Sequence, residues 1–233
     1  MAHQATYLRG ERRALTMVLS LSIPLAIIVF LCLPGISPIF RLFTNPSGGM
    51  LPTLSVGSYM LVSRASYGYS RYSFDGFDLP IAGRWPASLP RRGDIIAFRL
   101  PRDHKTFYVK RVVGLPGDKI QMIGGRLSID GQLVSREPAP KWRDPSDQKA
   151  EGESYIERLA EGASYRIIEM AGDTGRYDNT PEFVVPAGHV FALGDNRDNS
   201  TDSREQSSRY GIGFVPVELV LGRIVLTFGG RTE

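Results

Sequence analysis

Cysteine and histidine are both scarce in this sequence, and each scarcity excludes a class of site. The 233 residues include one cysteine, Cys32, so no disulfide can form within the chain and cysteine usage does not indicate a redox compartment. The three histidines, His3, His104 and His189, stand far apart and lack the spacing of zinc ligands. The sequence therefore predicts neither a disulfide framework nor a zinc site.

A large excess of charge of one sign is also missing. Lysine and arginine number 28 against 24 aspartate and glutamate residues, which gives a net charge of +4, and both signs are scattered along the chain. Proteins that bind nucleic acid usually gather their basic residues on one helix or stripe. We therefore expect no nucleic-acid partner, whereas a weak attraction to anionic lipid is consistent with the apolar segment near the N-terminus.

That segment, residues 14–40, reads ALTMVLSLSIPLAIIVFLCLPGISPIF and contains no charged residue. A helix needs about 20 apolar residues to cross the bilayer core, and membrane helices tolerate a proline such as Pro24. The apolar core of a cleaved signal peptide spans only about 7–15 residues. A buried helix of a globular domain would show a polar periodicity that is missing here. The segment therefore predicts a membrane anchor over residues 14–36.

Flanking charges predict the orientation of this anchor. Three arginines precede it within residues 1–13 and Arg41 alone follows closely, so the positive-inside rule places that N-terminal stretch in the cytoplasm. A second apolar segment, residues 218–228, is short and is interrupted by Arg223. We therefore expect a single-pass protein of the inner (cell) membrane, with residues 41–233 on the periplasmic, extracytoplasmic side.

Glycine (25 residues) and proline (16 residues) are frequent, and they favour many turns and short strands over long helices. Beyond the anchor, short apolar or alternating runs between turn residues predict strands at 58–63, 94–100, 106–113, 119–123, 126–129, 132–134, 155–158, 165–170, 183–185, 189–193 and 222–228. Residues 136–153 are polar and contain prolines, so a loop or small excursion is predicted there. The predicted fold class is a mostly β, antiparallel domain with residues 121–183 as an inserted subregion.

The first of three segments that could carry chemistry is NPSGGMLPTL, residues 45–54, just beyond the anchor. Prolines near both ends and two central glycines, Gly48 and Gly49, give it the character of a tight loop. One interpretation is a plain turn that leads into a strand. The other is a reactive loop, in which Ser47 is the only hydroxyl before Met50.

The second segment, YVKRVV at residues 108–113, predicts a strand in which Tyr108, Lys110 and Val112 share one face. Lys110 therefore stands among apolar neighbours, and two outcomes are open. Its stem can pack against them while the amine extends into water. Alternatively the amine is buried, and burial disfavours the charged form and lowers the pKa of the lysine, as a general base requires.

The third segment, GDNRDNSTDSR at residues 194–204, is rich in oxygen-bearing side chains. Such a loop can bind calcium, but its two arginines count against a cation. Aspartate and arginine two residues apart, Asp195 with Arg197 and Asp202 with Arg204, instead indicate a loop held by salt bridges and hydrogen bonds. A solvated surface loop is the remaining alternative.

Together these segments resemble the bacterial type I signal peptidases, which are membrane-anchored Ser/Lys endopeptidases that remove signal peptides from exported proteins. The family motif Pro-Ser-x-Ser-Met-x-Pro-Thr-Leu is similar to PSGGMLPTL here. The other family motifs are similar to YVKRVVGLPGDKI (108–120) and GDNRDNSTDSR, and RRGDIIAF (91–98) and GFVP (213–216) also match. The resemblance extends from the anchor to near the C-terminus, in the right order.

The resemblance implies a single transmembrane helix followed by a signal-peptidase-like antiparallel β catalytic domain with an inserted β subdomain. It implies hydrolysis of preproteins held at the lipid bilayer, in which a serine attacks the scissile carbonyl and a neutral lysine accepts its proton. Lys110 aligns with that general base, and Ser47 aligns with the hydroxyl that donates to the oxyanion. No metal and no organic cofactor is implied, and we expect a monomer.

The resemblance also implies roles for residues around this pair. The pockets for small substrate side chains align with Met50, Leu54, Tyr108 and Val109. The residues that support the surroundings of the lysine align with Ser200, Asp202 and Arg204.

The sequence departs from the family motif where the family has its nucleophile. Gly49 occupies the position of the serine immediately before methionine, and glycine has no side chain with which to form an acyl-enzyme. Ser47 lies about 6.5–7 Å away in an extended chain, so the loop would have to rearrange for it to take over. One hypothesis is therefore a signal peptidase with little or no activity. The others are a pseudopeptidase that binds signal peptides or membrane partners without cleavage, and an engineered or erroneous loss of the serine.

Overall fold

The computed structural model describes residues 22, 37–74, 76, 78–144, 150–207 and 209–230. The predicted cytoplasmic segment, residues 1–13, lies outside these residues, and so does the predicted anchor, residues 14–36, apart from Ser22. Within the described ranges, no helix combines the length and the apolar character needed to cross a membrane. The anchor and its orientation therefore stay predictions.

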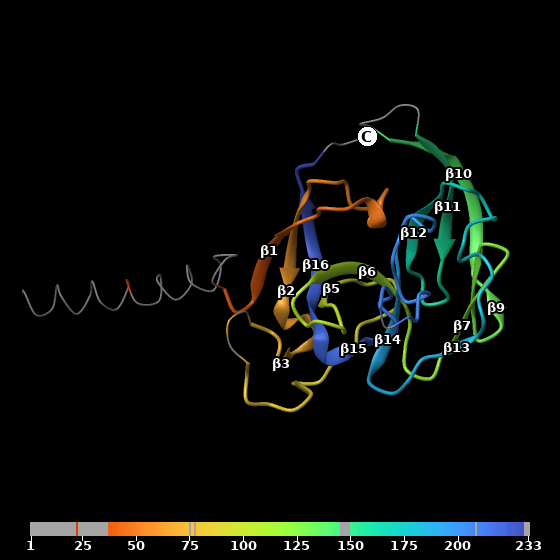
Figure 1. Ribbon diagram of the computed structural model, residues 1–233. Helices are drawn as coiled ribbons and strands as arrows, with labels where there is room; N and C mark the ends of the chain where they lie inside the picture. Colours follow the sequence, from red (N-terminus) through yellow and green to blue (C-terminus); the bar gives the residue numbers. More distant parts are fainter. Residues whose placement is uncertain are drawn as a thin grey trace, which may run out of the picture.

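A seven-stranded antiparallel sheet forms the larger part of the molecule (Figure 1). Its spatial order is β1 (Phe40–Thr44), β2 (Tyr59–Ser63), β16 (Val220–Phe228), β5 (Ile95–Arg99), β6 (Phe107–Gly114), β14 (His189–Leu193) and β15 (Val215–Pro216). Strand β16 pairs with both β2 and β5, so the last strand lies between strands from the first half of the chain. A short pair, β3 (Tyr69–Ser70) with β4 (Arg84–Trp85), forms a sheet of its own.

Two smaller sheets are built by residues between β6 and β14. The four-stranded sheet has the order β13 (Phe183–Val184), β7 (Lys119–Ile123), β8 (Arg126–Ile129) and β9 (Gln132–Leu133). The three-stranded sheet has the order β10 (Ser135–Arg143), β11 (Glu151–Arg158) and β12 (Ser164–Glu169). These strand pairs are antiparallel, so the prediction of a mostly β, antiparallel fold is confirmed. The inserted subregion of residues 121–183 stays a prediction.

The predicted strands agree well with the observed ones, with a clear exception at residues 136–153. The bounds of β7, β8 and β14 are those predicted, and Gly124 and Gly131 take the positive φ that the turns after β7 and β8 require. The loop predicted for residues 136–153 is wrong, because β10 and the start of β11 occupy most of it. Strand β10 contains Pro138 and Pro140 but lies at a sheet edge, where a residue without an N–H donor is tolerated.

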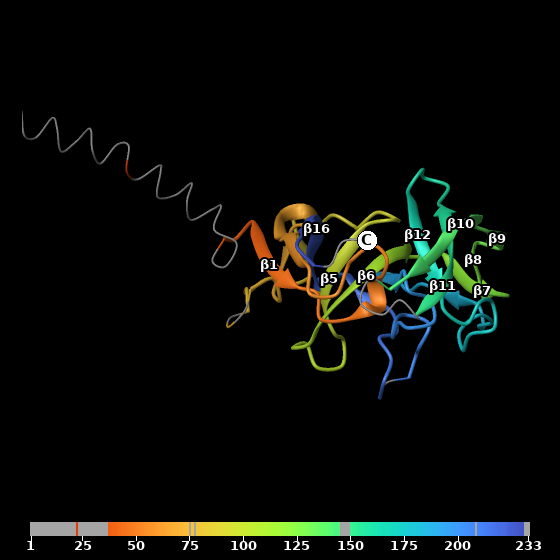
Figure 2. The ribbon, with the colours of Figure 1, turned by 90° about the horizontal axis from the view of Figure 1, so that it is seen from above.

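Clusters of buried apolar side chains hold the sheets together. One cluster covers the large sheet around β5, β6 and β14 and includes Phe98 and Val112. A second joins β6 and β14 to the smaller sheets through residues such as Phe191, Met122 and Ile167. Viewed from above, the large sheet and the two smaller sheets lie side by side (Figure 2). The second cluster is therefore the contact that fixes the smaller sheets against the large one.

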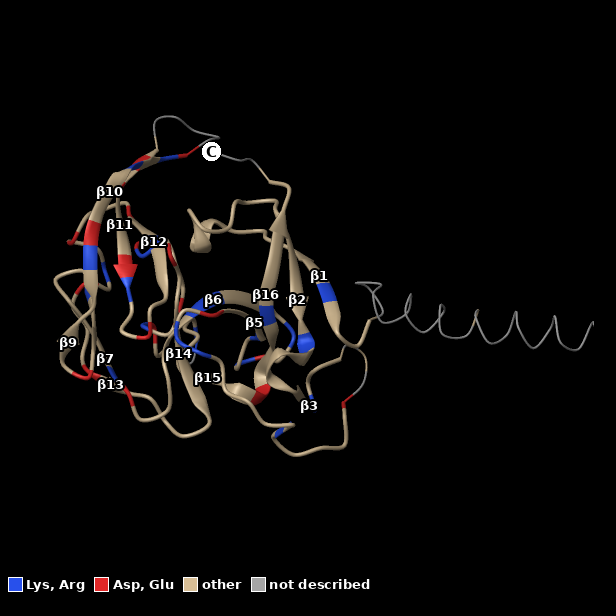
Figure 3. Cartoon of the chain, turned by 180° about the vertical axis from the view of Figure 1, so that it is seen from behind, with Lys and Arg blue, Asp and Glu red and all other residues tan. Residues whose placement is uncertain are grey.

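Charged residues are distributed unevenly over these strands (Figure 3). Strands β10 and β11 carry residues of both signs, whereas β2 has no charged residue and β16 has only Arg223. The exposed side chains of Tyr59, Leu226 and Phe228 lie on this uncharged side, where the rings of Tyr59 and Phe228 stack with centroids 5.5 Å apart. The β2–β16 region therefore presents apolar side chains to the outside.

A buried ion pair between Arg197 and Glu157 joins the loop of residues 194–204 to β11. Both side chains are 1% exposed, and Arg197 donates from Nη1 to Oε1 at 2.9 Å and from Nη2 to Oε2 at 2.6 Å. Burial alone would lower the pKa of Arg197, but the negative charge of Glu157 raises it, so the guanidinium stays charged. The prediction that Arg197 pairs with Asp195 is wrong, because Glu157 of β11 takes that place.

We predict that Glu157→Gln lowers the free energy of unfolding by about 3–5 kcal/mol, because the charge of Arg197 is then buried without its partner. Urea unfolding of the full chain in detergent measures this loss. Glu137→Gln is the matched control, since Glu137 pairs with Arg158 on the surface and exposed pairs contribute little. Equal losses in the two variants would contradict the role assigned to the buried pair.

Candidate active site

Asn45 holds the loop of residues 45–54 in place. Its backbone N–H donates to the carbonyl of Ser58 at 2.8 Å, and its own carbonyl accepts from the N–H of Gly57 at 2.8 Å. Its side-chain amide donates to the carbonyl of Leu54 at 3.1 Å. The two ends of the loop are thereby tied to each other, which gives this Pro/Gly-rich segment one conformation.

Gly49 lies in the short 3-10 helix η1 (Gly48–Met50). Asn196 binds this helix to the segment of residues 194–204, the third motif. The N–H of Asn196 donates to the carbonyl of Gly49 at 3.3 Å, and its side-chain amide donates to the carbonyl of Gly48 at 3.1 Å. Gly194 permits this approach, because a Cβ at that position would overlap the carbonyl oxygen of Gly49. The first and third motifs are therefore in direct contact.

Lys110 is a buried lysine of β6. It is 4% exposed, and its amine lies 5.5 Å from the centre of the Tyr108 ring. Burial lowers the pKa of Lys110 below the ordinary lysine value of 10.5, although the charges of Asp202 and Asp195 act in the opposite direction. Of the two outcomes that the sequence leaves open, burial is confirmed and extension of the amine into water is wrong. A neutral, buried amine can accept a proton as a general base.

The amine of Lys110 faces position 49. An ideal Cβ built on Gly49 would lie 3.1 Å from Nζ of Lys110, 3.5 Å from the carbonyl oxygen of Asn199 and 3.8 Å from Oγ of Ser200. The φ of Gly49 lies outside the left-handed region, so the backbone accepts any residue there. Because Nζ is the end of the flexible Lys110 side chain, a small shift of that side chain accommodates a Cβ at position 49. A hydroxyl on that Cβ would then be within hydrogen-bond reach of the amine.

Two ion pairs surround this lysine. Arg204 donates from Nε and Nη2 to the carboxylate of Asp202 at 2.9 and 2.8 Å, which confirms the salt bridge predicted within the loop. Arg111 donates from Nε and Nη2 to Asp195 at 2.8 and 2.6 Å. Burial alone would raise the pKa of Asp202, but Arg204 outweighs it and holds that pKa below its ordinary value. The negative charge beside Lys110 is therefore stable.

A cleft with a volume of about 810 Å³ opens at Gly49 and Lys110. The predicted site residues that line it are Ser47, Gly49, Tyr108, Val109, Lys110 and Ser200. Met50 and Leu54, which the resemblance assigns to substrate pockets, instead pack in a buried apolar cluster and are each 2% exposed. The structure therefore brings six of the ten predicted site residues into one cleft. Met50 and Leu54 lie in the wall behind it, and Asp202 and Arg204 are buried without lining it.

Ser47 is exposed at the entrance of this cleft. Its backbone is extended, with φ −134° and ψ 156°, and its side chain makes no capping hydrogen bond to the following 3-10 helix. The hydroxyl is therefore accessible to a molecule bound in the cleft.

Three residues that the sequence does not single out complete the geometry: Thr53, Arg111 and Asn196. Thr53 donates a hydrogen bond to Asp195, and Arg111 donates to the carbonyl of Gly93 at 2.8 Å in addition to its ion pair. Alternation along β6 turns Arg111 to the face opposite Lys110, and this was the one feature of the sequence that could have identified Arg111. The contact of Asn196 with the η1 backbone depends on tertiary structure and leaves no sequence pattern.

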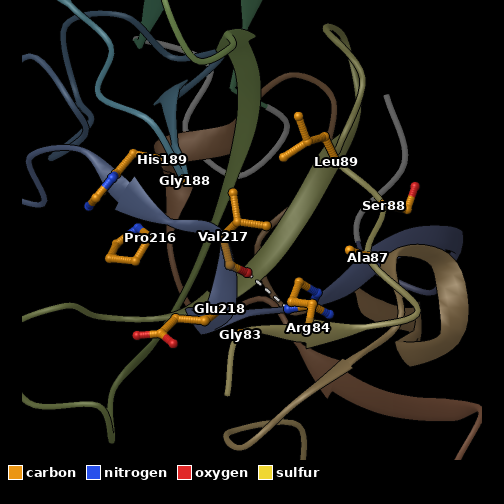
Figure 4. Close-up of a pocket in the computed structure, with 10 residues that line it drawn as sticks. All are labelled: Gly83, Arg84, Ala87, Ser88, Leu89, Gly188, His189, Pro216, Val217 and Glu218. Atoms are coloured by element: carbon orange, nitrogen blue, oxygen red, sulfur yellow. Dashed lines mark hydrogen bonds between the residues drawn. The ribbon is translucent and has the colours of Figure 1, made fainter. Parts of the chain in front are cut away.

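A second pocket, of about 520 Å³, lies elsewhere on the molecule (Figure 4). Leu89, His189 and Glu218 are among the residues that line it, and Arg84 donates there to the carbonyl of Val217 at 2.9 Å. None of the predicted site residues lines this pocket. The cleft at Lys110 is therefore the candidate active site.

Comparisons with known proteins show the family to which the chain belongs. The family model described as signal peptidase, peptidase S26, matches residues 15–228. A signal peptidase I from Rickettsia typhi is 39% identical over 193 residues, which cover 78% of this chain and 69% of the relative. A signal peptidase I from Rickettsia canadensis is 41% identical over 186 residues, which cover 76% of this chain and 66% of the relative.

A crystal structure of a signal peptidase I from Enterococcus faecalis is 28% identical, with a TM-score of 0.34, and the match covers 59% of this chain and 98% of that one. The matched region spans about two thirds of the length of the two Rickettsia relatives. Because the family model covers most of the chain and these relatives are about 40% identical, the chain belongs to the signal peptidase I family, peptidase family S26.

Proposed function

We propose that the cleft is a signal peptidase active site in which Gly49 occupies the nucleophile position, so that cleavage of signal peptides is lost or greatly reduced. The observation that carries this proposal is the distance of 3.1 Å between a Cβ at position 49 and Nζ of Lys110. A nucleophilic hydroxyl and its general base have to lie within hydrogen-bond reach of each other, and this position meets that requirement for a serine.

The remaining roles follow the resemblance. Lys110 is the general base, and the accessible hydroxyl of Ser47 donates to the oxyanion. Tyr108 and Val109 contact the substrate, and Val109 packs against the cluster that contains Met50 and Leu54, which shape the pocket from behind. The residues that position Lys110 are Ser200, Asp202 and Arg204. The substrates are preproteins at the extracytoplasmic face of the membrane, to which the anchor holds the chain.

The chemical consequence of Gly49 is the loss of the first covalent step. In the family reaction, serine Oγ forms a bond to the scissile carbonyl carbon while the lysine amine takes the hydroxyl proton. Glycine has no atom that can form this bond. Ser47 stands two residues before position 49, outside the 3-10 helix η1, whereas attack tolerates a misplacement of only about 1 Å. Its exposed position therefore suits an oxyanion donor better than a substitute nucleophile.

A second candidate function is binding without cleavage. The cleft, the buried lysine and the ion pairs around it are all formed around a residue that has no side chain. A pseudopeptidase that captures signal peptides or membrane partners needs this cleft but not the nucleophile. The same chain can therefore retain a binding role in which the peptide leaves uncut.

We predict that Gly49→Ser raises the rate of preprotein cleavage by at least about 10³-fold over the parent chain, because it restores a hydroxyl beside the buried amine. Cleavage is measured with purified full-length protein and a preprotein in detergent.

Gly49→Ala is the matched control for this experiment, since it adds the Cβ without a hydroxyl and should leave the rate at the parental level. A parent that cleaves as fast as Gly49→Ser would disprove the assignment of position 49, and loss of that activity in Ser47→Ala would then identify Ser47 as the nucleophile. If no variant cleaves but all bind the preprotein, binding without cleavage is the function.

The lowered pKa of Lys110 predicts the pH dependence of the Gly49→Ser variant. Only the neutral amine accepts a proton, so kcat/KM should rise with pH and reach its plateau well below pH 10.5, the ordinary pKa of lysine. The profile is recorded between about pH 6 and pH 11.5, with Lys110→Met as an inactive control. A rise centred on pH 10.5 would show that the amine is not neutralised by burial.

A further inference from the structure

Three carboxylates that take no part in the proposed reaction meet beside the cleft. Glu169 ends β12, Asp178 belongs to the following loop, and Asp198 belongs to the third motif. One carboxylate oxygen of each lies within 4.8 Å of those of the other two. Glu169 is 0% exposed, Asp178 is 1% exposed and Asp198 is half-buried. These residues are called the carboxylate trio below.

Three carboxylate oxygens of the trio accept no hydrogen bond from the described residues. Neither Oε of Glu169 accepts a hydrogen bond, and Oδ1 of Asp178 accepts none either. The salt bridges of the described ranges include no member of the trio. Buried carboxylates without donors are costly, and three of them together also repel one another. A cation between them would remove both penalties.

The arginines closest in sequence to Asp198 make no hydrogen bond to Glu169, although their positive charges oppose the rise in the pKa of Glu169 that burial causes. Arg197 binds the carboxylate of Glu157 with both terminal nitrogens, and Arg204 binds Asp202 with Nε and Nη2. Each guanidinium is thus committed to a different carboxylate in a two-point contact.

The loop of residues 171–179 folds around the trio. Asp198 Oδ2 accepts the N–H of Ala171 at 2.7 Å, and Asp178 Oδ2 accepts the N–H of Gly175 at 2.5 Å. A Cβ at Gly175 would overlap Oδ1 of Asp198, so only glycine allows the loop backbone to come this close. One oxygen of each aspartate therefore holds the loop, while Oδ1 of Asp178 remains available beside Glu169.

The chemistry of the trio selects the type of ion. Its ligand atoms are all carboxylate oxygens, which suit hard cations, and the trio includes no nitrogen or sulfur ligand for zinc or copper. Ca²⁺ accepts irregular sets of six to eight oxygens, whereas Mg²⁺ demands a nearly ideal octahedron. We infer that Glu169, Asp178 and Asp198 bind one Ca²⁺ ion, which ties the loop of residues 171–179 to the third motif.

Such an ion would stiffen one wall of the cleft. Arg176 and Tyr177 of the loop line the cleft together with Asp198, on the side of Asn199 and Ser200. Half-buried Asp198 also gives the ion a path from the cleft. Binding of this ion does not depend on whether the cleft cleaves peptides.

The test is calcium binding to the full chain in detergent after treatment with EDTA. Equilibrium dialysis with ⁴⁵Ca²⁺ should find one bound ion per chain. Thermal unfolding should shift upward by about 3–5 °C at a CaCl₂ concentration ten times the Kd. Glu169→Gln and Asp198→Asn should each weaken binding at least about tenfold and remove the shift. Because Glu169→Gln relieves like-charge repulsion, its Tm in EDTA should not fall below that of the parent.

Glu137→Gln, the same change at an exposed position outside the trio, should bind Ca²⁺ like the parent. The proposal is overturned if the parent binds no Ca²⁺ up to 5 mM, which would mean that the three carboxyl groups share protons instead. It is also overturned if Glu169→Gln and Asp198→Asn keep the full shift, since the ion then binds elsewhere. An equal shift with MgCl₂ would overturn the assignment to Ca²⁺.

Discussion

The ion pair between Arg111 and Asp195 joins the three segments from which the cleft is built. Arg111 belongs to β6, Asp195 to the loop of residues 194–204, and Thr53 of the loop of residues 45–54 donates to the same carboxylate. Both charged side chains are buried, at 8% and 1% exposure. A buried pair is stable only when its geometry is good and its remaining polar atoms find partners, and Thr53 and the carbonyl of Gly93 provide such partners. This pair therefore links the strand that carries Lys110 to the loop that carries Gly49.

This framework explains how a complete cleft can form around a glycine. The contacts that hold Gly49 use its backbone carbonyl and that of Gly48, which Asn196 binds. Lys110 is buried by its position in β6, between β5 and β14, and does not depend on a partner at position 49. The fold therefore positions Lys110 and residue 49 independently of each other. A serine at position 49 would add one hydrogen bond to an arrangement that is already formed.

Many of the strands and the position of Lys110 could be predicted from the sequence. Strong turn residues delimit β7 and β8, and alternation places Lys110 on an apolar face. Alternation alone could not decide whether the lysine amine is buried, since that depends on the strands that flank β6. The partner of Arg197 was missed because Glu157 is 40 residues away and belongs to another sheet. Strand β10 was missed because its prolines read as a loop, although an edge strand tolerates them.

The reactivity of a cysteine at position 49 tests the central claim, that this position faces the amine of Lys110, most directly. In a chain that also carries Cys32→Ala, the alkylation rate of Gly49→Cys is measured against pH, with and without Lys110→Met. If position 49 faces the amine of Lys110, the amine takes up the thiol proton, so the thiol titrates below the ordinary value of about 8.5 and loses this shift in Lys110→Met. A thiol that titrates at the same pH in both chains would contradict the account.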